Sequence, residues 1–257
     1  MNQTGGVNQN LKFLIMDELF DLYQKHISAR LNFHGSFTNF GEDSIRYDFY
    51  IALMKLFDLD PHQIILEQAI PESQFIQKKR NFSELKQGRH QDKPEFDLRV
   101  DPTVKLNNGI LAEFAFFRNP RIGKVDVSGA YGKLLNEMHR LALLKHYRNE
   151  QKVEEYADFS EYNCLLICIT DSVMLNYGNG TRGKRPAHNI LDEYYLDDQF
   201  ISPPLANGII DSIDQKFRKK TQELNIIPTA KRIYDVSISH NDCPWGIWVW
   251  EINYSSN

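Results

Sequence analysis

The sequence predicts an α/β fold, in which helices cover a buried β-sheet. Apolar residues recur at helical spacing in several long segments, whereas other, shorter runs are apolar at nearly every position. The first pattern is typical of amphipathic helices and the second of strands covered on both faces. Of the 257 residues, 42% are hydrophobic and 25% are charged, a balance that favours a folded globular protein over a disordered one.

The first predicted elements are two helices and a strand. Residues 11–31 carry an apolar stripe at helical spacing, and the polar residues 1–10 before them are expected to form a flexible arm. A second helix is expected to begin near Glu42 and to end before Pro61, because the residue before a proline avoids the helical conformation. Residues 63–70 then have the composition of a strand.

A pair of strands follows, over residues 95–100 and 110–117. Residues 107–109, Asn-Asn-Gly, lie in their connection and tolerate the positive φ that hairpin turns require. A long helix is expected over residues 125–148 and a buried strand over residues 163–170. Further helices are expected near residues 190–196 and 209–224, and two last strands near residues 232–239 and 246–252.

The chain carries no signature of a membrane or secreted protein. Its longest apolar runs, such as residues 165–169, are far too short to cross a bilayer, and the N-terminus lacks the basic and apolar regions of a signal peptide. Three cysteines, an odd number, fit a reducing compartment better than a disulfide framework. We therefore expect a cytoplasmic protein.

Two groups of residues that could suggest chemistry are better explained by packing. Cys164 and Cys168 lie inside an apolar run without a second pair of metal ligands nearby, so we expect them in the core. Trp248, Trp250 and Ile252 share one face of the last predicted strand, which places them in the core or in a dimer interface rather than against bases.

Two acidic residues stand where strands are otherwise apolar. Glu113 lies within residues 110–117, whose other members are apolar on both faces, and Asp97 lies between Phe96 and Leu98. A buried carboxylate costs several kcal/mol unless it is neutralised, paired or bound to a cation. If the two strands pair as a hairpin, the carboxylates can converge on one point.

Two explanations of these acids remain open from the residue types alone. Converging carboxylates suit a hard divalent cation such as Mg²⁺, which can activate water and stabilise the charge that develops on a phosphate. Alternatively, each acid forms an ordinary buried ion pair, and Arg99 and Arg118 are close enough in sequence to be the partners.

The order helix, strand, strand with Asp97, strand with Glu113, long helix, strand resembles the PD-(D/E)xK nuclease superfamily, the fold of many restriction endonucleases. Pro94-Glu95-Phe96-Asp97 resembles the first half of the superfamily motif and Glu113-Phe114-Ala115 the second. The resemblance covers about residues 42–170. It implies a restriction-endonuclease-like central mixed β-sheet flanked by helices, in a single domain over residues 11–257 with residues 171–257 as an elaboration.

The resemblance implies that Asp97 and Glu113 bind Mg²⁺, for which Mn²⁺ would substitute, with help from the Phe114 carbonyl. Glu42 matches a helix-borne acid that some relatives use as an extra ligand. Alternatively, Glu42 is a first-turn acid that complements the helix dipole. Glu67 could be a further ligand or a solvent-facing residue of an edge strand.

The sequence departs from the superfamily pattern at Ala115, where a lysine is expected. That lysine helps to orient the water and to stabilise the pentacovalent phosphate. Three explanations compete: a deliberate change to alanine that silences the site, a role taken over by Lys133, Lys124 or Arg118, and a naturally inactive binding domain.

The resemblance thus implies a Mg²⁺-dependent endonuclease that hydrolyses phosphodiester bonds in DNA, in restriction or defence, as a homodimer. The alternatives are a catalytically inactive nucleic-acid-binding module of the same fold and an unrelated α/β interaction domain with buried ion pairs. Despite the net charge of −4, basic residues are clustered and are expected to contact phosphates. These residues are Lys78, Lys79, Arg80, Arg89, Lys93, Arg118, Arg182, Lys184 and Arg185.

Overall fold

The structure is a computed structural model that describes residues 5–35, 41–69, 95–117, 127–146, 158–171, 221–240 and 243–256. Its elements follow in the order α1-α2-β1-β2-β3-α3-β4-β5-β6. The helices are α1 (Gly5–His34), α2 (Glu42–Phe57) and α3 (Val127–His146), and the strands are β1 (Ile64–Ala69), β2 (Glu95–Val100), β3 (Ile110–Phe117), β4 (Asn163–Asp171), β5 (Ile226–His240) and β6 (Cys243–Ser256).

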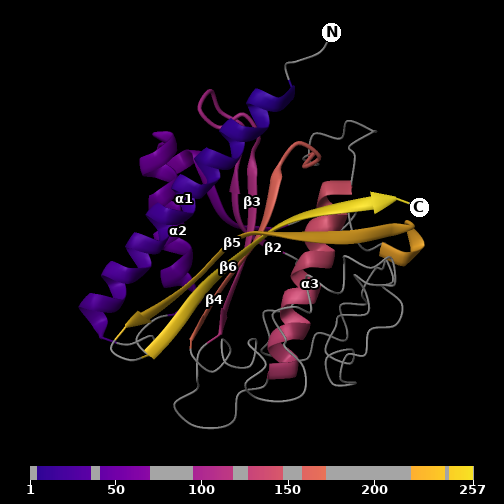
Figure 1. The fold of residues 1–257 in the computed structure, drawn as a ribbon. Coiled ribbons are helices and arrows are strands. Elements are labelled where there is room, and N and C mark those ends of the chain that lie inside the picture. Colours follow the sequence, from indigo (N-terminus) through magenta and orange to yellow (C-terminus); the bar gives the residue numbers. More distant parts are fainter. Residues whose placement is uncertain are drawn as a thin grey trace.

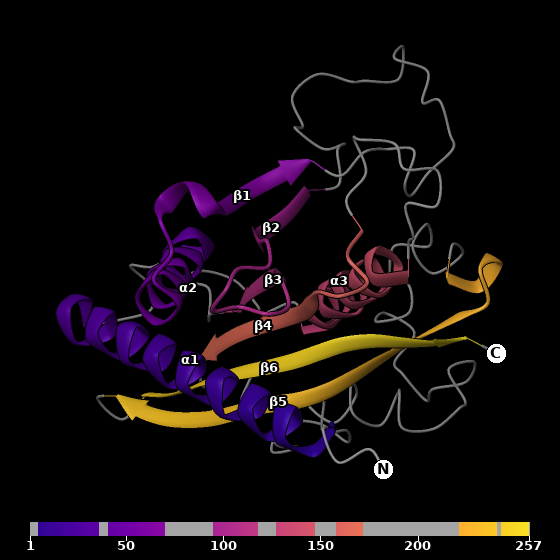
Figure 2. The same cartoon turned by 90° about the horizontal axis from the view of Figure 1, so that it is seen from above.

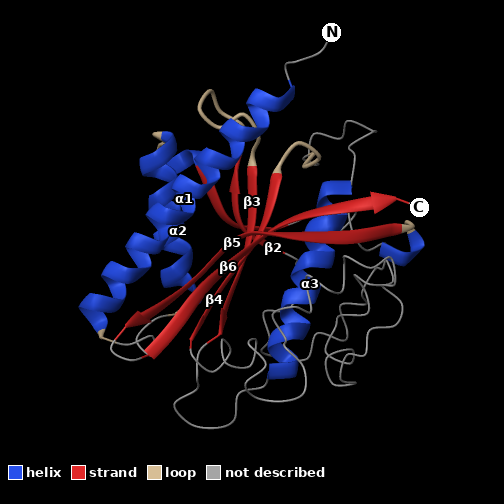
Figure 3. Cartoon of the chain, in the orientation of Figure 1, coloured by secondary structure: helices blue, strands red, loops and turns tan. Residues whose placement is uncertain are grey.

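All six strands belong to one mixed sheet with the order β1-β2-β3-β4-β6-β5. Strands β3 and β4 run parallel, and every other neighbouring pair is antiparallel (Figure 3). Helix α3 lies in the connection between β3 and β4, since parallel neighbours require a crossover. Helices α1 and α2 lie on one side of the sheet and α3 on the other (Figure 1), which confirms the predicted α/β class.

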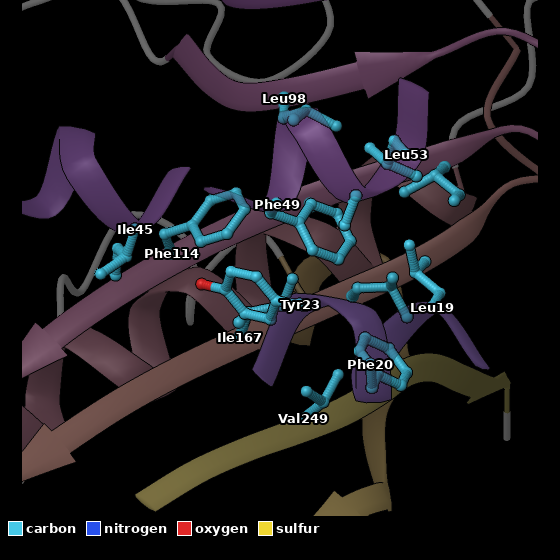
Figure 4. Close-up of a cluster of buried hydrophobic side chains, with 14 of the residues drawn as sticks. Leu19, Phe20, Tyr23, Ile45, Phe49, Leu53, Leu98, Phe114, Ile167 and Val249 are labelled. Carbon is cyan, nitrogen blue, oxygen red and sulfur yellow. The ribbon is translucent and has the colours of Figure 1, made fainter. Parts of the chain in front are cut away.

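Two apolar clusters hold these layers together, one on each face of the sheet. Strand β3 contributes to both because successive side chains point to opposite faces. Leu111 and Ala115 pack in the cluster with α3, whereas Ala112 and Phe114 pack in the cluster with α1 and α2. In Figure 4, Phe114 lies among the side chains of α1 and α2, and its ring meets that of Phe49 edge to face at 5.5 Å.

Helix α1 crosses the sheet as far as its last strands, alongside β5 and β6 (Figure 2). The ring of Phe20 packs on that of Tyr234 at 5.3 Å, and the Tyr234 hydroxyl donates to Asp21 at 3.0 Å. The C-terminal strands therefore belong to the same packed body as the predicted core, although the sequence resemblance stops before them.

The ends of several elements differ from the predictions. Helix α1 begins at Gly5, so residues 5–10 are helical although a flexible arm was expected there. A helix can extend beyond its apolar stripe because its backbone hydrogen bonds are internal. Strands β5 and β6 are longer than predicted, since they pair with each other over almost their full lengths, and the pattern of apolar residues marks only their buried parts.

Glycine is needed at position 109 for a different reason from the one that the sequence suggested. Among the described residues, the positive-φ positions are Gly35, Asp58, Glu67 and Asn225, so the connection between β2 and β3 contains none. A Cβ atom at position 109 would lie 2.3 Å from the ring of Tyr162. Glycine is therefore required by the close approach of that ring, not by a turn.

Trp248 and Trp250 are buried in the cluster with α3, as expected for core residues. Cys164 and Cys168 are also fully buried there. No helix in the described part of the chain is long and apolar enough to cross a membrane.

Burial predicts that these two thiols are inert in the folded protein. It raises the pKa of Cys164 to about 12 and raises that of Cys168 further, so almost no reactive thiolate forms near pH 8. In a Cys243→Ser variant, iodoacetamide should leave both thiols unmodified until denaturant is added, as followed by mass spectrometry. Rapid alkylation of either thiol without denaturant would contradict the packing of β4.

Candidate functional site

The pairing of β2 with β3 stops at the two acids that the sequence singled out. Main-chain pairing extends as far as Leu98 opposite Ala112 and ends before Asp97. The Asp97 Oδ2 atom instead accepts a hydrogen bond from the Phe114 main-chain N–H at 2.7 Å. A side-chain carboxylate thus takes the place of a main-chain acceptor, and it lies where the two strands part.

Three acids form a row across the first three strands. The antiparallel register of β1 and β2 places Glu67 opposite Asp97, between the pairs Leu66–Leu98 and Gln68–Phe96. One step beyond the last pair of β2 and β3, Glu113 is the residue opposite Asp97. Glu67 has a φ of 52°, a left-handed conformation that is unusual for a residue other than glycine and marks local strain.

Arg46 of α2 joins two members of this row. Its guanidinium donates to Glu67 Oε1 at 2.6 Å and to Asp97 Oδ1 at 2.9 Å. Asp43 lies 3.5 Å away and Glu42 4.0 Å away, so four carboxylates surround one side chain that is 9% exposed. This role of Arg46 was not predicted from the sequence, because α2 was predicted from its apolar stripe alone.

The third member, Glu113, is paired on the other side of the sheet. Its Oε2 atom forms an ion pair with Arg140 of α3, and the same guanidinium nitrogen also pairs with Glu137. Burial raises the pKa of Glu113 well above its ordinary range; Arg140 acts in the opposite direction, and the charges of Glu137 and Asp97 add to the rise. Glu137 is a site residue that the sequence interpretation missed, although it shares a helix face with Arg140.

Lys133, one turn before Glu137 on α3, completes the cluster. Its ammonium group contacts both oxygens of Glu42, at 2.8 and 3.0 Å, and therefore links α3 to the start of α2. Lys133 also interacts electrostatically with Cys168, which is the direct neighbour of Ala115 in the sheet. The charge of Lys133 therefore acts on the strand position next to Ala115, where the resemblance would place a lysine.

The cluster carries an excess of negative charge. Among the described residues it combines six acids with three basic side chains, an excess of three negative charges when all are ionised. The Glu113 Oε1 atom is buried and has no hydrogen-bond partner in the described part of the chain. Oxygen donors with surplus negative charge are the ligands that Mg²⁺ prefers, so the donor set fits a divalent cation.

The carboxylates do not converge in the arrangement seen here. Within the described ranges, no three acidic, histidine or cysteine side chains lie close enough together to hold a metal ion. Asp97 is paired with Arg46 of α2 and Glu113 with Arg140 of α3, so each acid is engaged by an arginine of a different helix. Asp97 and Glu113 thus each form an ion pair with an arginine, but these arginines are not the two suggested by sequence proximity.

Of the expected partners, Arg99 is paired with Asp101 at 2.6 Å, and Arg118 lies outside the described residues. Glu42 begins α2 as predicted and belongs to the cluster. The basic residues expected to contact DNA all lie outside the described residues, namely Lys78, Lys79, Arg80, Arg89, Lys93, Arg118, Arg182, Lys184 and Arg185.

The raised pKa of Glu113 predicts a particular pH dependence of stability. The folded protein holds the Glu113 proton more tightly than the unfolded chain does. The protonated Glu113 side chain therefore contributes to the free energy of unfolding, fully below about pH 4.5. This contribution is lost as the pH rises through the folded-state pKa. Glu113→Gln abolishes this titration and leaves Arg140 paired with Glu137. Its stability relative to the wild type should rise by about 1.4 kcal/mol for each unit by which folding raises the pKa.

The measurement is urea unfolding of both proteins, in EDTA, at several pH values from about 4.5 to 8. A constant difference in the free energy of unfolding across that range would contradict the raised pKa.

No protein-family model, no curated protein and no solved structure matches this chain. The resemblance to the PD-(D/E)xK nucleases therefore stays a prediction from the sequence.

Proposed function

We propose that the chain is a metal-dependent endonuclease that hydrolyses phosphodiester bonds in DNA, with Asp97 and Glu113 as ligands of Mg²⁺. The observation that carries the proposal is the row of acids at the point where β2 and β3 part, with a buried Glu113 oxygen that lacks a hydrogen-bond partner in the described part of the chain. The element order α2-β1-β2-β3-α3-β4 agrees with the order on which the resemblance rests.

Each proposed ligand is positioned by a different element. Asp97 is fixed by the Phe114 N–H, and the Phe114 carbonyl, which the resemblance adds as a ligand, belongs to the same residue. Glu113 is oriented by Arg140, and Glu42 is held near them by Lys133. When bound, Mg²⁺ (or Mn²⁺ in its place) would lower the pKa of a water molecule and stabilise negative charge on the phosphate.

We assign the role of the missing lysine to Lys133. Ala115 is completely buried in the α3-side cluster, and the ammonium group of Lys133 lies within electrostatic reach of the adjacent Cys168. Lys133 is 38% exposed, so a phosphate can approach it. Its positive charge would stabilise the pentacovalent phosphate, as the strand lysine does in the superfamily.

The charge of the site also bears on the substrate. With an excess of negative charge, it repels a phosphodiester until a divalent cation is bound, so DNA binding at the site should depend on the cation. The basic segments of the sequence would contribute contacts that weaken with salt. Restriction or defence is the proposed context, with a homodimer cutting both strands.

One observation favours the second candidate, an inactive nucleic-acid-binding module. Both oxygens of Asp97 are engaged, by Arg46 and by the Phe114 N–H, and Glu113 is engaged by Arg140. If these ion pairs are permanent, they occupy the place of the cation, and the protein binds DNA without cutting it.

The deciding experiment incubates duplex DNA and Mg²⁺ with the wild type and its variants. We expect the wild type to cut, and Lys133→Met to lose about 10²–10³-fold in cleavage rate, the usual effect of removing one group that stabilises the transition state. Lys105→Met is the matched control, since Lys105 pairs only with the exposed Asp58, at 3.0 Å, among the contacts that the structure describes. Its rate should match that of the wild type.

The Ala115→Lys variant separates the remaining outcomes. Cutting by Ala115→Lys but not by the wild type would show that the alanine silences the site and that Lys133 does not replace the lysine. Salt-dependent DNA binding without cutting by either protein would favour the inactive module. If neither protein binds or cuts duplex DNA at any Mg²⁺ concentration, the nuclease proposal is wrong for this substrate.

A further inference from the structure

Arg46 occupies the centre of the proposed metal site. It donates to Asp97 Oδ1 at 2.9 Å and to Glu67 Oε1 at 2.6 Å, and its side chain is almost fully buried. The other Asp97 oxygen is already used by the Phe114 N–H at 2.7 Å. Each Asp97 oxygen thus accepts one hydrogen bond, and the guanidinium is the charged one of the two donors.

A guanidinium and a divalent cation repel each other strongly when they share one partly buried carboxylate oxygen. Asp97 cannot gain the full attraction of the cation while Arg46 stays in place. Glu113 is paired separately, with Arg140 of α3.

Arg46 has a second set of partners on its outer side. Glu67, which is 61% exposed, and Asp43, which is 75% exposed, both contact its Nη1 atom, whereas Asp97 is contacted through Nη2. The guanidinium can thus release Asp97 and remain paired with Glu67 and Asp43. Glu67 keeps a left-handed φ of 52° in this position, and such strain persists only where surrounding contacts enforce it.

We propose that Arg46 is a resident counter-ion that competes with the divalent cation for Asp97, so that metal binding and the release of Asp97 by Arg46 occur together. This inference rests on the proposed metal site and deepens it. Without the cation, Arg46 neutralises the acids and keeps the site closed. With the cation, Arg46 shifts toward Glu67 and Asp43 and leaves a positive charge at the edge where a phosphate approaches.

The competition is measured by Mn²⁺ binding, followed by electron paramagnetic resonance of the free ion, without DNA. Arg46→Gln should bind Mn²⁺ about 5- to 150-fold more tightly than the wild type, the usual range for coupled equilibria. Arg46→Lys should show a smaller gain, because a single ammonium cannot bridge two carboxylates as a guanidinium does. Arg46→Lys also provides the test if circular dichroism shows that Arg46→Gln does not fold.

Two controls separate competition at Asp97 from a general effect of charge. Arg30→Gln removes an arginine that pairs with Asp48 at 2.5 Å, outside the cluster, and should leave Mn²⁺ affinity unchanged. Lys133→Gln removes a positive charge from the same cluster without touching Asp97, and should raise the affinity less than Arg46→Gln does.

The outcomes distinguish this inference from the proposed function. If the wild type binds Mn²⁺ but the Arg46 variants bind equally or more weakly, the competition is absent while the metal site stands. Equal gains for Arg46→Gln and Lys133→Gln would reduce the effect to general charge and overturn the inference. If neither the wild type nor any folded variant binds Mn²⁺, the metal site itself is wrong, and the inference falls with it.

Discussion

A carboxylate at the centre of a strand buried on both faces is the constraint on which the rest of the site depends. Glu113 is 1% exposed, and its strand pairs with β4 along its full length. An ionised carboxylate there is tolerated only with a counter-charge at hand. Arg140 provides it, so α3 must cross β3 at the level where that side chain reaches Glu113. Charge as well as apolar packing thus sets the position of the helix on the sheet.

Strands β2 and β3 part where a side chain replaces the main chain as hydrogen-bond acceptor. At Asp97 a carboxylate accepts the Phe114 N–H, and the ladder between the strands ends there. The main-chain donor stays satisfied, so the opening leaves no unpaired N–H at that point. Because the opening lies opposite Glu67, the first three strands present their acids at the same level. The register of the strands therefore determines where the three acids lie relative to one another.

Helices and strands were predicted well from the sequence wherever burial produces a regular spacing of apolar residues. The apolar run of β3 identified the strand, and the isolated Glu113 within it identified the residue that needs a partner. The partners themselves could not be predicted, because they come from helices distant in the chain. Arg99 was a reasonable guess by proximity, yet it turns to Asp101, whereas Arg46 reaches Asp97 from another element. The spacing of apolar residues predicts a helix but does not show which of its arginines is buried.

The number of charges in the cluster is itself an argument about function. Asp43 and Glu67, two of the acids around Arg46, are largely exposed, and exposed ion pairs contribute little to stability. Replacing buried ion pairs by apolar residues of similar volume is often neutral or stabilising, so the fold does not need so many acids. Helices α1 and α2, by comparison, pack through apolar side chains and are also joined by the Arg30–Asp48 ion pair. Six acids around three basic side chains are harder to explain by stability alone, since like charges at close range repel. Under the proposed function, a metal site that needs carboxylate ligands would explain these acids. Arg46 and Arg140 would then balance the charge of the acids before the cation binds.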